Sequence, residues 1–486
     1  MQRIVVIGGG LTGAAFVLHL LRDHDPVVRI TVVEPRPVLG AGLAYSTGDP
    51  VHRVNVAAGR MSLFDEQPGH FDDWLRAHFM PQDDPEGIAP AGLFPRRALY
   101  GQYVDETLRA ALGGARATLG HRRERAVAVG VREARFEVWL EGGGSLQADL
   151  LVLAASHTSP DLPGVLRPLA ADERLVADPW APEALAGIEP DGAVMVVGTG
   201  LTGCDVIASL CRRGHRGPIL AVSRRGLLPR TRTALPVTSF GRFDEAPERT
   251  ALGLLRRVRA AVAEVRQLGR PWEDVVAALR SQARVVWGAL PDEERRRLLR
   301  HARPFWDAHR FQSAPQIDTI LAEASTRGQL RLMAATLRAV SAEPGGLRVA
   351  LHPRGAAAGR EVEERVAAIV NCTGPGHRSV VEQHPVLASL AEQDALQADG
   401  CRLGIAVDAS SRVIDAAGRP WPNLFVVGPL ARGTHGELMG LPQVSAQPRE
   451  VAAEVARLIS RNPVAEVRIP GGVEGPSPSR PAAPSP

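Results

Sequence analysis

The stretch Ile4–Gly13 reads IVVIGGGLTG, an apolar run that ends in a glycine-rich turn. A second stretch, Val194–Gly203, reads VMVVGTGLTG and has the same form. Each places G-x-G-x-x-G after an apolar strand pattern and before a helical pattern, a context that distinguishes the motif from a chance match. Such glycines allow a tight turn and let a pyrophosphate approach the backbone at a helix N-terminus. The chain is therefore expected to contain two dinucleotide-binding units.

The two motifs are followed by opposite charges. The next apolar strand ends in Glu34 after the first motif and in Ser223 followed by Arg224 and Arg225 after the second. A carboxylate accepts a hydrogen bond from a ribose 2′-OH, whereas arginine suits a 2′-phosphate. The alternatives are an ordinary strand-to-helix turn for either motif alone and a solvated surface side chain for Arg225. We expect FAD at the first motif and NADPH at the second, bound through Gly8, Gly10, Gly13 and Glu34 and through Gly198, Gly200, Gly203, Arg224 and Arg225, respectively.

Length and composition restrict the class of protein. A chain of 486 residues is too long for one hydrophobic core and indicates two or three domains. No apolar run approaches the roughly 20 residues of a membrane span, and the N-terminus enters a strand pattern too early for a signal peptide. We therefore expect a cytoplasmic protein without a membrane partner. The net charge of +4 does not favour nucleic acid binding.

Lysine and paired cysteines are both missing from the sequence. All 57 basic residues are arginine, so Schiff-base chemistry on a lysine, including that of pyridoxal phosphate, is excluded. The four cysteines, Cys204, Cys211, Cys372 and Cys401, form no C-x-x-C motif and no zinc-like spacing. We expect no metal site, and we expect Cys204 and Cys211 to be buried small apolar residues. The pattern argues against a disulfide reductase.

The sequence pattern predicts an α/β protein with two Rossmann-like domains, the second inserted in the first. We expect residues 1–165 to form the first segment of an FAD-binding domain and residues 360–460 its second segment. Residues 190–355 are expected to form an NADPH-binding domain, with a helical insert at 248–310 where apolar residues keep helical spacing. The tail, 461–486, is rich in proline, glycine and serine and is predicted to be disordered.

With these motifs in place, the chain resembles a family of bacterial FAD/NAD(P)-binding flavoproteins. This family is related to the flavin-containing and amino-acid N-hydroxylating monooxygenases. Besides the two glycine motifs, the resemblance rests on two strands ending in small-residue turns, Leu153–Ser156 and Asn371–Gly374. It also rests on the stretches Gly40–Tyr45, Pro95–Tyr103 and Phe305–His309, and it spans roughly residues 1–460.

Two strand ends depart from the pattern of that superfamily. The first connecting strand ends in Ala155-Ser156-His157 instead of Ala-Thr-Gly. The last strand runs into Gly428-Pro429 instead of Gly-Asp, whose aspartate contacts the flavin ribityl chain in the superfamily. The resemblance still implies that Gly428 lies at the cofactor, but the ribityl contact must come from another residue.

The resemblance implies an FAD-dependent, NADPH-oxidising monooxygenase that hydroxylates a small polar substrate, with an amine or amino acid expected. Its partners would then be a small-molecule substrate and oxygen. Two alternatives stay open at this point. One is an FAD-dependent NAD(P)H:acceptor oxidoreductase that inserts no oxygen. The other is a flavin- and NADPH-binding redox sensor whose helical insert contacts a partner.

Three sets of side chains are candidates for the chemistry around the cofactors. His435 opens the final helical region, which we expect to start at His435 or Gln443, and a helix N-terminus there would stabilise negative charge on the flavin. His309 and Arg310 follow Trp306 and would receive the nicotinamide or an anionic substrate. Arg97, with Arg96, is placed at a helix start to bind a phosphate or carboxylate. The alternatives are a loop histidine, an amphipathic helix end and a surface arginine pair.

Overall fold

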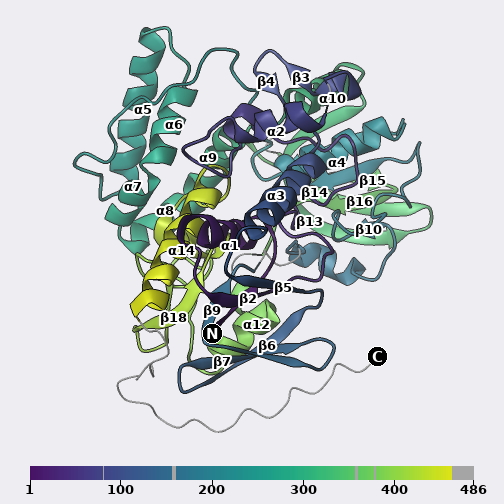
Figure 1. Cartoon of the computed structure of the whole chain (residues 1–486). Helices are drawn as coiled ribbons and strands as arrows, with labels where there is room; N and C mark the ends of the chain where they lie inside the picture. The colour runs from purple at the N-terminus through teal and green to yellow at the C-terminus, as the bar shows by residue number, and fades with distance from the viewer. Residues whose placement is uncertain (80, 156–159, 356–358, 377–378, 462–486) are drawn as a thin grey trace. The chain divides into compact units, whose positions relative to one another are not determined.

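The computed structural model describes residues 1–79, 81–155, 160–355, 359–376 and 379–461. The chain folds into two compact units, each built around a mainly parallel sheet (Figure 1). The first unit comprises Met1–Gly42, Gly101–Ser156 and His377–Pro486, and the second comprises Leu43–Tyr100 and His157–Gly376. The predicted fold class, two Rossmann-like units with the second inserted in the first, is confirmed.

The first unit has a six-stranded sheet with β1 at the point where the strand order reverses. β1 pairs in parallel with β2 on one side and with β9 on the other, and α1 connects β1 to β2. Ligands bind at the carboxyl ends of the strands at such a switch point. Its elements, in sheet order, are β17 (Arg412–Ile414), β18 (Pro420–Val426), β9 (Leu150–Leu153), β1 (Gln2–Ile7), β2 (Val28–Val33) and β5 (Thr118–Arg122), with α1 at Leu11–His24.

A core cluster of this unit lies between the six-stranded sheet and a smaller antiparallel sheet. Val5, Leu151 and Leu424 of the large sheet belong to one buried cluster with Phe136 of the small sheet and Leu387. On another side, α1 packs against α14. The elements are β6 (Ala126–Arg132), β7 (Arg135–Leu140), β8 (Ser145–Ala148), α3 (Arg97–Leu112), α11 (Val380–Gln383), α12 (Pro385–Ala391), α13 (Arg432–His435) and α14 (Gln443–Arg461).

The second unit repeats the switch-point arrangement around β11. Here β11 pairs in parallel with β12 and with β16, and Val197 lies opposite both Val222 and Asn371. We expected the chain from residue 360 onward to return to the FAD domain, but β16 completes this second sheet. Its elements, in sheet order, are β10 (Leu175–Val176), β16 (Ala368–Asn371), β11 (Val194–Val197), β12 (Ile219–Ser223), β13 (Leu330–Glu343), β14 (Gly346–Pro353) and β15 (Val362–Val366), with α4 (Leu201–Arg212) after β11.

Helices fill the stretch between β12 and β13, as the apolar spacing predicts. Phe243, Val265 and Val275 form the centre of a separate hydrophobic cluster among them. The helices are α5 (Ala251–Gln267), α6 (Glu273–Ser281), α7 (Ala283–Ala289), α8 (Asp292–His301), α9 (Arg303–Arg310) and α10 (Pro315–Thr326).

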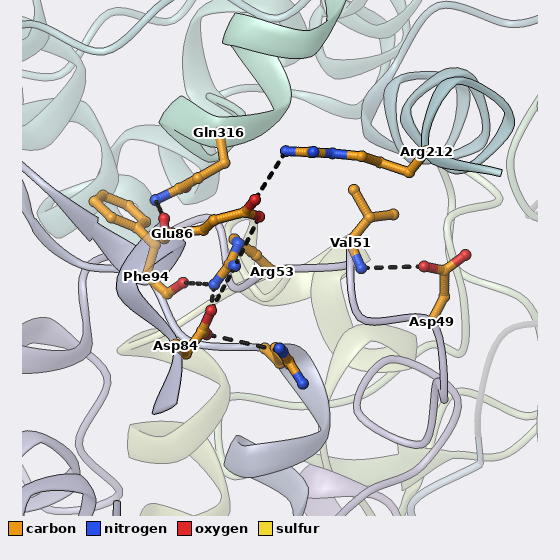
Figure 2. A network of polar contacts seen from close by, with 9 residues as sticks. Asp49, Val51, Arg53, Asp84, Glu86, Phe94, Arg212 and Gln316 are labelled. Carbon is orange, nitrogen blue, oxygen red and sulfur yellow. Dashed lines mark hydrogen bonds and ion pairs between the residues drawn. The ribbon is translucent and has the colours of Figure 1, made fainter. Parts of the chain in front are cut away.

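The segment 43–100, expected within the first FAD segment, packs with the second unit. It contains α2 (His70–His78), β3 (Ile88–Ala89) and β4 (Gly92–Leu93). Figure 2 shows the buried Arg53 bonded to both oxygens of Asp84 at 2.7 and 2.8 Å. Glu86 pairs with Arg212 of α4 at 3.3 Å, and its carbonyl accepts a bond from Gln316 of α10 at 2.7 Å. These contacts attach the segment to α4 and α10, whereas the assignment of domains to FAD and NADPH stays a prediction.

The described part of the chain has neither a membrane-spanning helix nor a cluster of metal-ligating side chains. None of its helices combines the length and apolar character that crossing a membrane requires. No group of histidine, cysteine, aspartate and glutamate side chains in that part could hold a metal ion. The predictions about His157 and about the tail after Arg461 lie outside the described residues.

Candidate functional site

The first glycine motif forms a tight turn between β1 and α1. Gly8 has φ +104°, and a Cβ there would lie 2.3 Å from the carbonyl oxygen of Ala154. A Cβ on Gly13 would lie 2.1 Å from the carbonyl oxygen of Gly8. A Cβ on Gly10 would meet only the Cα of Gly42, at an ordinary 3.4 Å. The protein's own packing therefore requires glycine at the first and third positions but leaves space in front of the second.

The second motif, between β11 and α4, has the same geometry. Gly198 has φ +111°, and its Cβ would lie 2.2 Å from the carbonyl oxygen of Cys372. A Cβ on Gly203 would lie 2.2 Å from the carbonyl oxygen of Gly198. In the described part of the chain, no atom lies within 4 Å of a Cβ built on Gly200. Both motifs thus leave the backbone bare at the position where a pyrophosphate approaches in dinucleotide-binding turns.

Each motif also presents an uncapped helix N-terminus. Gly10 and Gly200 are the N-cap residues of α1 and α4, with nearly equal extended conformations (φ −70°, ψ −168° and φ −80°, ψ −168°). Neither cap supplies a side-chain hydrogen bond, and the first turns contain no acidic residue. The free N–H groups and the positive end of the helix dipole favour an anion there.

Glu34 lies buried beside the first turn, with 5% of its surface exposed. Its Oε2 accepts a bond from the Gly9 N–H at 3.0 Å, and its Oε1 accepts from the backbone and side chain of Arg36, each at 3.1 Å. An ionised carboxylate has about four acceptor positions. Glu34 therefore keeps capacity for a ribose hydroxyl, and this role stays a prediction.

The corresponding end of β12 is more open. Arg224 and Arg225 are exposed, and the Arg225 guanidinium lies 5.5 Å from the ring centroid of Phe305 on α9. In this turn the hydroxyl of Thr199 lies 2.8 Å from Ser223 Oγ. Two guanidinium groups are thus exposed to a 2′-phosphate, and their binding role stays a prediction.

Gly428 is brought directly to the first glycine turn. It has φ +86°, and a Cβ there would lie 2.7 Å from Thr12 Cγ2. Its N–H donates to Oε1 of Gln447 on α14 at 2.9 Å. Sequence reasoning missed Gln447, because a single glutamine 19 residues downstream carries no motif. Gly42, from the stretch Gly40–Tyr45 that contributes to the family resemblance, also lies against Gly10.

His435 ends the short helix α13, and the last helix starts at Gln443, the second of the two expected starts. The His435 ring is buried, and its Nε2 lies 2.9 Å from Ser411 Oγ. Gln447 donates to the same hydroxyl at 2.9 Å, so His435, Ser411 and Gln447 form a chain of contacts that leads to Gly428. His435 therefore does not present a helix N-terminus, and its proposed catalytic role depends on its side chain.

His309 and Arg310 occupy the end of α9 in the second unit. The Nδ1 of His309 lies 2.7 Å from the carbonyl oxygen of Phe305, and its ring packs edge-on against Trp272 with centroids 4.9 Å apart. Arg310 is buried, with its guanidinium 4.6 Å from the ring centroid of Phe311. The loop after β12 is bonded to α9 through Arg230 N–H and Ala308 O at 2.8 Å. Arg225 and the loop after β12 therefore contact the helix that carries the predicted catalytic pair.

Arg97 belongs to the second unit and contacts the helix of the second motif. Its guanidinium forms an ion pair with Asp205 of α4 at 2.8 Å and donates to the carbonyl oxygen of Arg53 at 2.8 Å. Asp205 is buried, so this pair holds the first turn of α3, the part of that helix that belongs to the second unit, to α4. The predicted cofactor role of Arg97 would have to use the remaining donors of its guanidinium.

The cysteines show no sign of redox chemistry. Burial raises the pKa of the Cys204 and Cys372 thiols well above the ordinary range. Burial also raises the pKa of Cys211, which is half-buried. Thiols that stay protonated are poor nucleophiles, so these three are unsuited to disulfide exchange.

Comparison with known proteins agrees with this geometry. Residues 5–158 match a family model described as FAD-NAD(P)-binding. The matched stretch contains the whole first glycine motif and Glu34.

Relatives extend the comparison beyond this domain. Over 263 residues the chain is 30% identical to the L-aspartate N-monooxygenase (nitrosuccinate-forming) of Streptomyces cremeus, which covers 46% of this chain and 38% of that protein. The ornithine hydroxylase of Pseudomonas aeruginosa superposes with a TM-score of 0.63 at 14% identity, covering 94% of this chain and 99% of that one. The ornithine N-hydroxylase of Kutzneria sp. 744 gives 0.61 at 13% identity, with 94% and 99% covered. The chain thus shares its fold with both hydroxylases.

Proposed function

We propose that this protein is an FAD-dependent, NADPH-oxidising monooxygenase that hydroxylates the nitrogen of a small amine or amino acid. The observation that carries the proposal is the duplicated cradle in one chain. Gly10 and Gly200 each leave bare backbone before an uncapped helix N-terminus. Two dinucleotide sites in one chain suit an enzyme that moves reducing equivalents from a nicotinamide to a flavin.

The residues present fit both cofactors. The turn from Gly8 to Gly13 would hold the FAD pyrophosphate, Glu34 the adenosine ribose, and Gly428 would lie along the cofactor. The turn from Gly198 to Gly203 would hold the NADPH pyrophosphate and Arg224 its 2′-phosphate. When bound, the two cofactors would supply the redox chemistry that activates oxygen. The chain's own side chains orient the substrate, keep water out and stabilise charge.

We propose nitrogen as the atom that is oxygenated because the similar proteins are described as N-monooxygenases or N-hydroxylases. The Streptomyces cremeus relative is an L-aspartate N-monooxygenase, and the Kutzneria structure contains reduced FAD, NADP⁺ and L-ornithine. The buried, protonated thiols of Cys204 and Cys372 further disfavour a disulfide as the acceptor.

The test is turnover by the purified protein. We expect L-aspartate, L-ornithine, L-lysine or cadaverine to stimulate NADPH oxidation and to yield an N-hydroxylated product, measured by mass spectrometry. Rapid anaerobic reduction of a quinone without stimulation by any amine would instead assign the protein to the acceptor reductases. Cofactor binding without turnover would support the alternative of a flavin- and NADPH-binding redox sensor.

A variant of His309 tests the predicted catalytic pair. His309→Ala should retain FAD and NADPH-driven flavin reduction but form less product per NADPH, with more hydrogen peroxide, because a misplaced substrate uncouples oxidation from hydroxylation. An unchanged ratio of product to peroxide would remove His309 from the substrate site. His301→Ala, an exposed histidine on α8, is the matched control.

A further inference from the structure

The second unit contains an open pocket that none of the predicted cofactor residues lines. It lies between the loop after β12 and the junction of α5 with α6, and its volume is about 380 Å³. Its wall includes two threonines, two arginines, an aromatic ring and an acid: Thr231, Thr233, Arg266, Arg270, Trp272 and Glu273. A volume of this size is within the range of small-molecule sites.

Glu273 has an unusual environment on this wall. It is 7% exposed and is the first residue of α6. Its Oε1 accepts bonds from the Thr233 N–H and from Gln312 Nε2, each at 3.2 Å. Its Oε2 is buried and has no hydrogen-bond partner in the described part of the chain. Since a buried acceptor without a donor is destabilising, a ligand that supplies a donor here would be stabilised.

One cation of the protein lies close enough to act on Glu273. Burial and the nearby Arg60 lower the pKa of Arg232, while Asp318 and Glu273 raise it. The Nη2 of Arg232 donates to the carbonyl oxygen of Asn55 instead of to Glu273. Arg232 and Glu273 thus interact through space, and the buried Oε2 of Glu273 keeps no hydrogen-bond partner in the described part of the chain.

The other residues of the pocket wall indicate which charged groups a ligand would carry. The ring of Trp272 would attract a cation, since an ammonium group is stabilised over the face of an indole. Arg270 is already bound to Asp274 at 2.6 Å, whereas Arg266, on the last turn of α5, is exposed and offers a guanidinium to an anion. A ligand matching both charges has an ammonium and a carboxylate group. Trp272 also contacts His309, so the pocket adjoins the predicted catalytic helix.

We propose that this pocket binds a small zwitterionic amino acid, with its ammonium group on Glu273 and Trp272 and its carboxylate on Arg266. The binding chemistry follows from the pocket wall alone. That the bound amino acid is the enzyme's own substrate rests on the proposed function.

The experiment is titration calorimetry on the FAD-loaded protein without NADPH. The probes are L-aspartate with succinate, which lacks its ammonium group, and L-ornithine with putrescine, which lacks its carboxylate. We expect at least one amino acid to bind roughly tenfold or more tightly than its matched compound, since hydrogen bonds to charged groups are stronger than those between neutral groups. Glu273→Gln and Arg266→Ala should each weaken that binding about tenfold or more. Glu264→Gln, an exposed acid on α5, should leave it unchanged.

Several results would overturn the proposal. These are no binding by either amino acid, equal binding of each amino acid and its matched compound, or equal effects of Glu273→Gln and Glu264→Gln. A lower melting temperature for Glu273→Gln with unchanged binding would make Glu273 only the counter-ion of Arg232. If Glu273→Gln does not fold, Trp272→Leu and Arg266→Ala decide the question through the same titration.

A parallel assay separates this inference from the proposed function. If binding depends on Glu273 but no amino acid stimulates NADPH oxidation, the pocket binds amino acids and the proposed monooxygenase function is wrong. If an amino acid stimulates NADPH oxidation equally in the parent protein and in Glu273→Gln, the monooxygenase function is supported and the pocket is not the substrate site.

Discussion

The two glycine turns share a backbone but differ in how the chain surrounds them. At the first, the Gly9 N–H is bonded to the buried Glu34, the Gly9 carbonyl accepts from Gly40 at 2.7 Å, and Gly42 lies against Gly10. At the second, no described atom lies near a Cβ on Gly200, and the arginines beyond β12 are exposed. An enclosed cradle suits a cofactor that stays bound, and an open one suits a cofactor that exchanges with each turnover. This is the division expected between FAD and NADPH.

The largest effect is expected at the enclosed turn. Gly10→Val adds a side chain where the pyrophosphate would approach, while its Cβ meets only Gly42 at an ordinary distance. We expect a folded protein without flavin, measured by the visible absorbance and by circular dichroism. Full FAD content in this variant would refute the assignment of the first turn.

The same change at the open turn should separate the two sites. Gly200→Val has no described neighbour to clash with, so the variant should fold and keep its FAD. Its NADPH-driven flavin reduction should slow by roughly tenfold or more, equivalent to at least about 1.4 kcal/mol of lost binding. Stopped-flow reduction at several NADPH concentrations measures this. Loss of FAD from Gly200→Val would mean that the two turns do not hold different cofactors.

Both turns could be predicted from the sequence because each is a local feature. The glycine spacing and the charge after the next strand both depend on residues close together in the chain. The placement of β16 beside β11 could not be predicted, since the apolar sequence of a buried strand is compatible with either sheet. Gln447 and Glu273 were also missed. Their importance comes from contacts with residues far away in sequence, and no motif marks them.

A smaller effect should reveal the charge difference between the turns. Arg224→Ala removes a charge-assisted contact to the 2′-phosphate that contributes about 1.5–3 kcal/mol, roughly ten- to a hundredfold in affinity. The Michaelis constant for NADPH should rise by that factor, while the constant for NADH should change little. Arg225→Ala is the comparison variant, since Arg225 also lies over Phe305. Equal losses with NADPH and NADH would indicate that Arg224 supports the fold instead.

The smallest effect concerns the helix behind the open turn. His52, in the segment attached to α4, lies 3.0 Å from Ser209 Oγ through Nε2 and 2.8 Å from Thr47 Oγ1 through Nδ1. Burial lowers the pKa of His52 below its ordinary 6.5, with Asp205 and Asp49 opposing this and Arg97 and Arg213 adding to it. The unfolded chain therefore binds the proton more readily. The stability that neutral His52 contributes is complete above about pH 6.5 and is lost as the pH falls toward the folded-state pKa.

His52→Gln should therefore flatten the fall of the melting temperature between about pH 7 and pH 5. The comparison is with the parent protein and with His301→Gln, an exposed histidine on α8, in scanning fluorimetry. Burial lowers the pKa of His19 on α1 as well, so part of the slope should remain in the His52 variant and decrease further when His19 is also replaced. If His52→Gln and His301→Gln keep the parent slope equally, the attachment of the segment to α4 does not depend on a neutral His52.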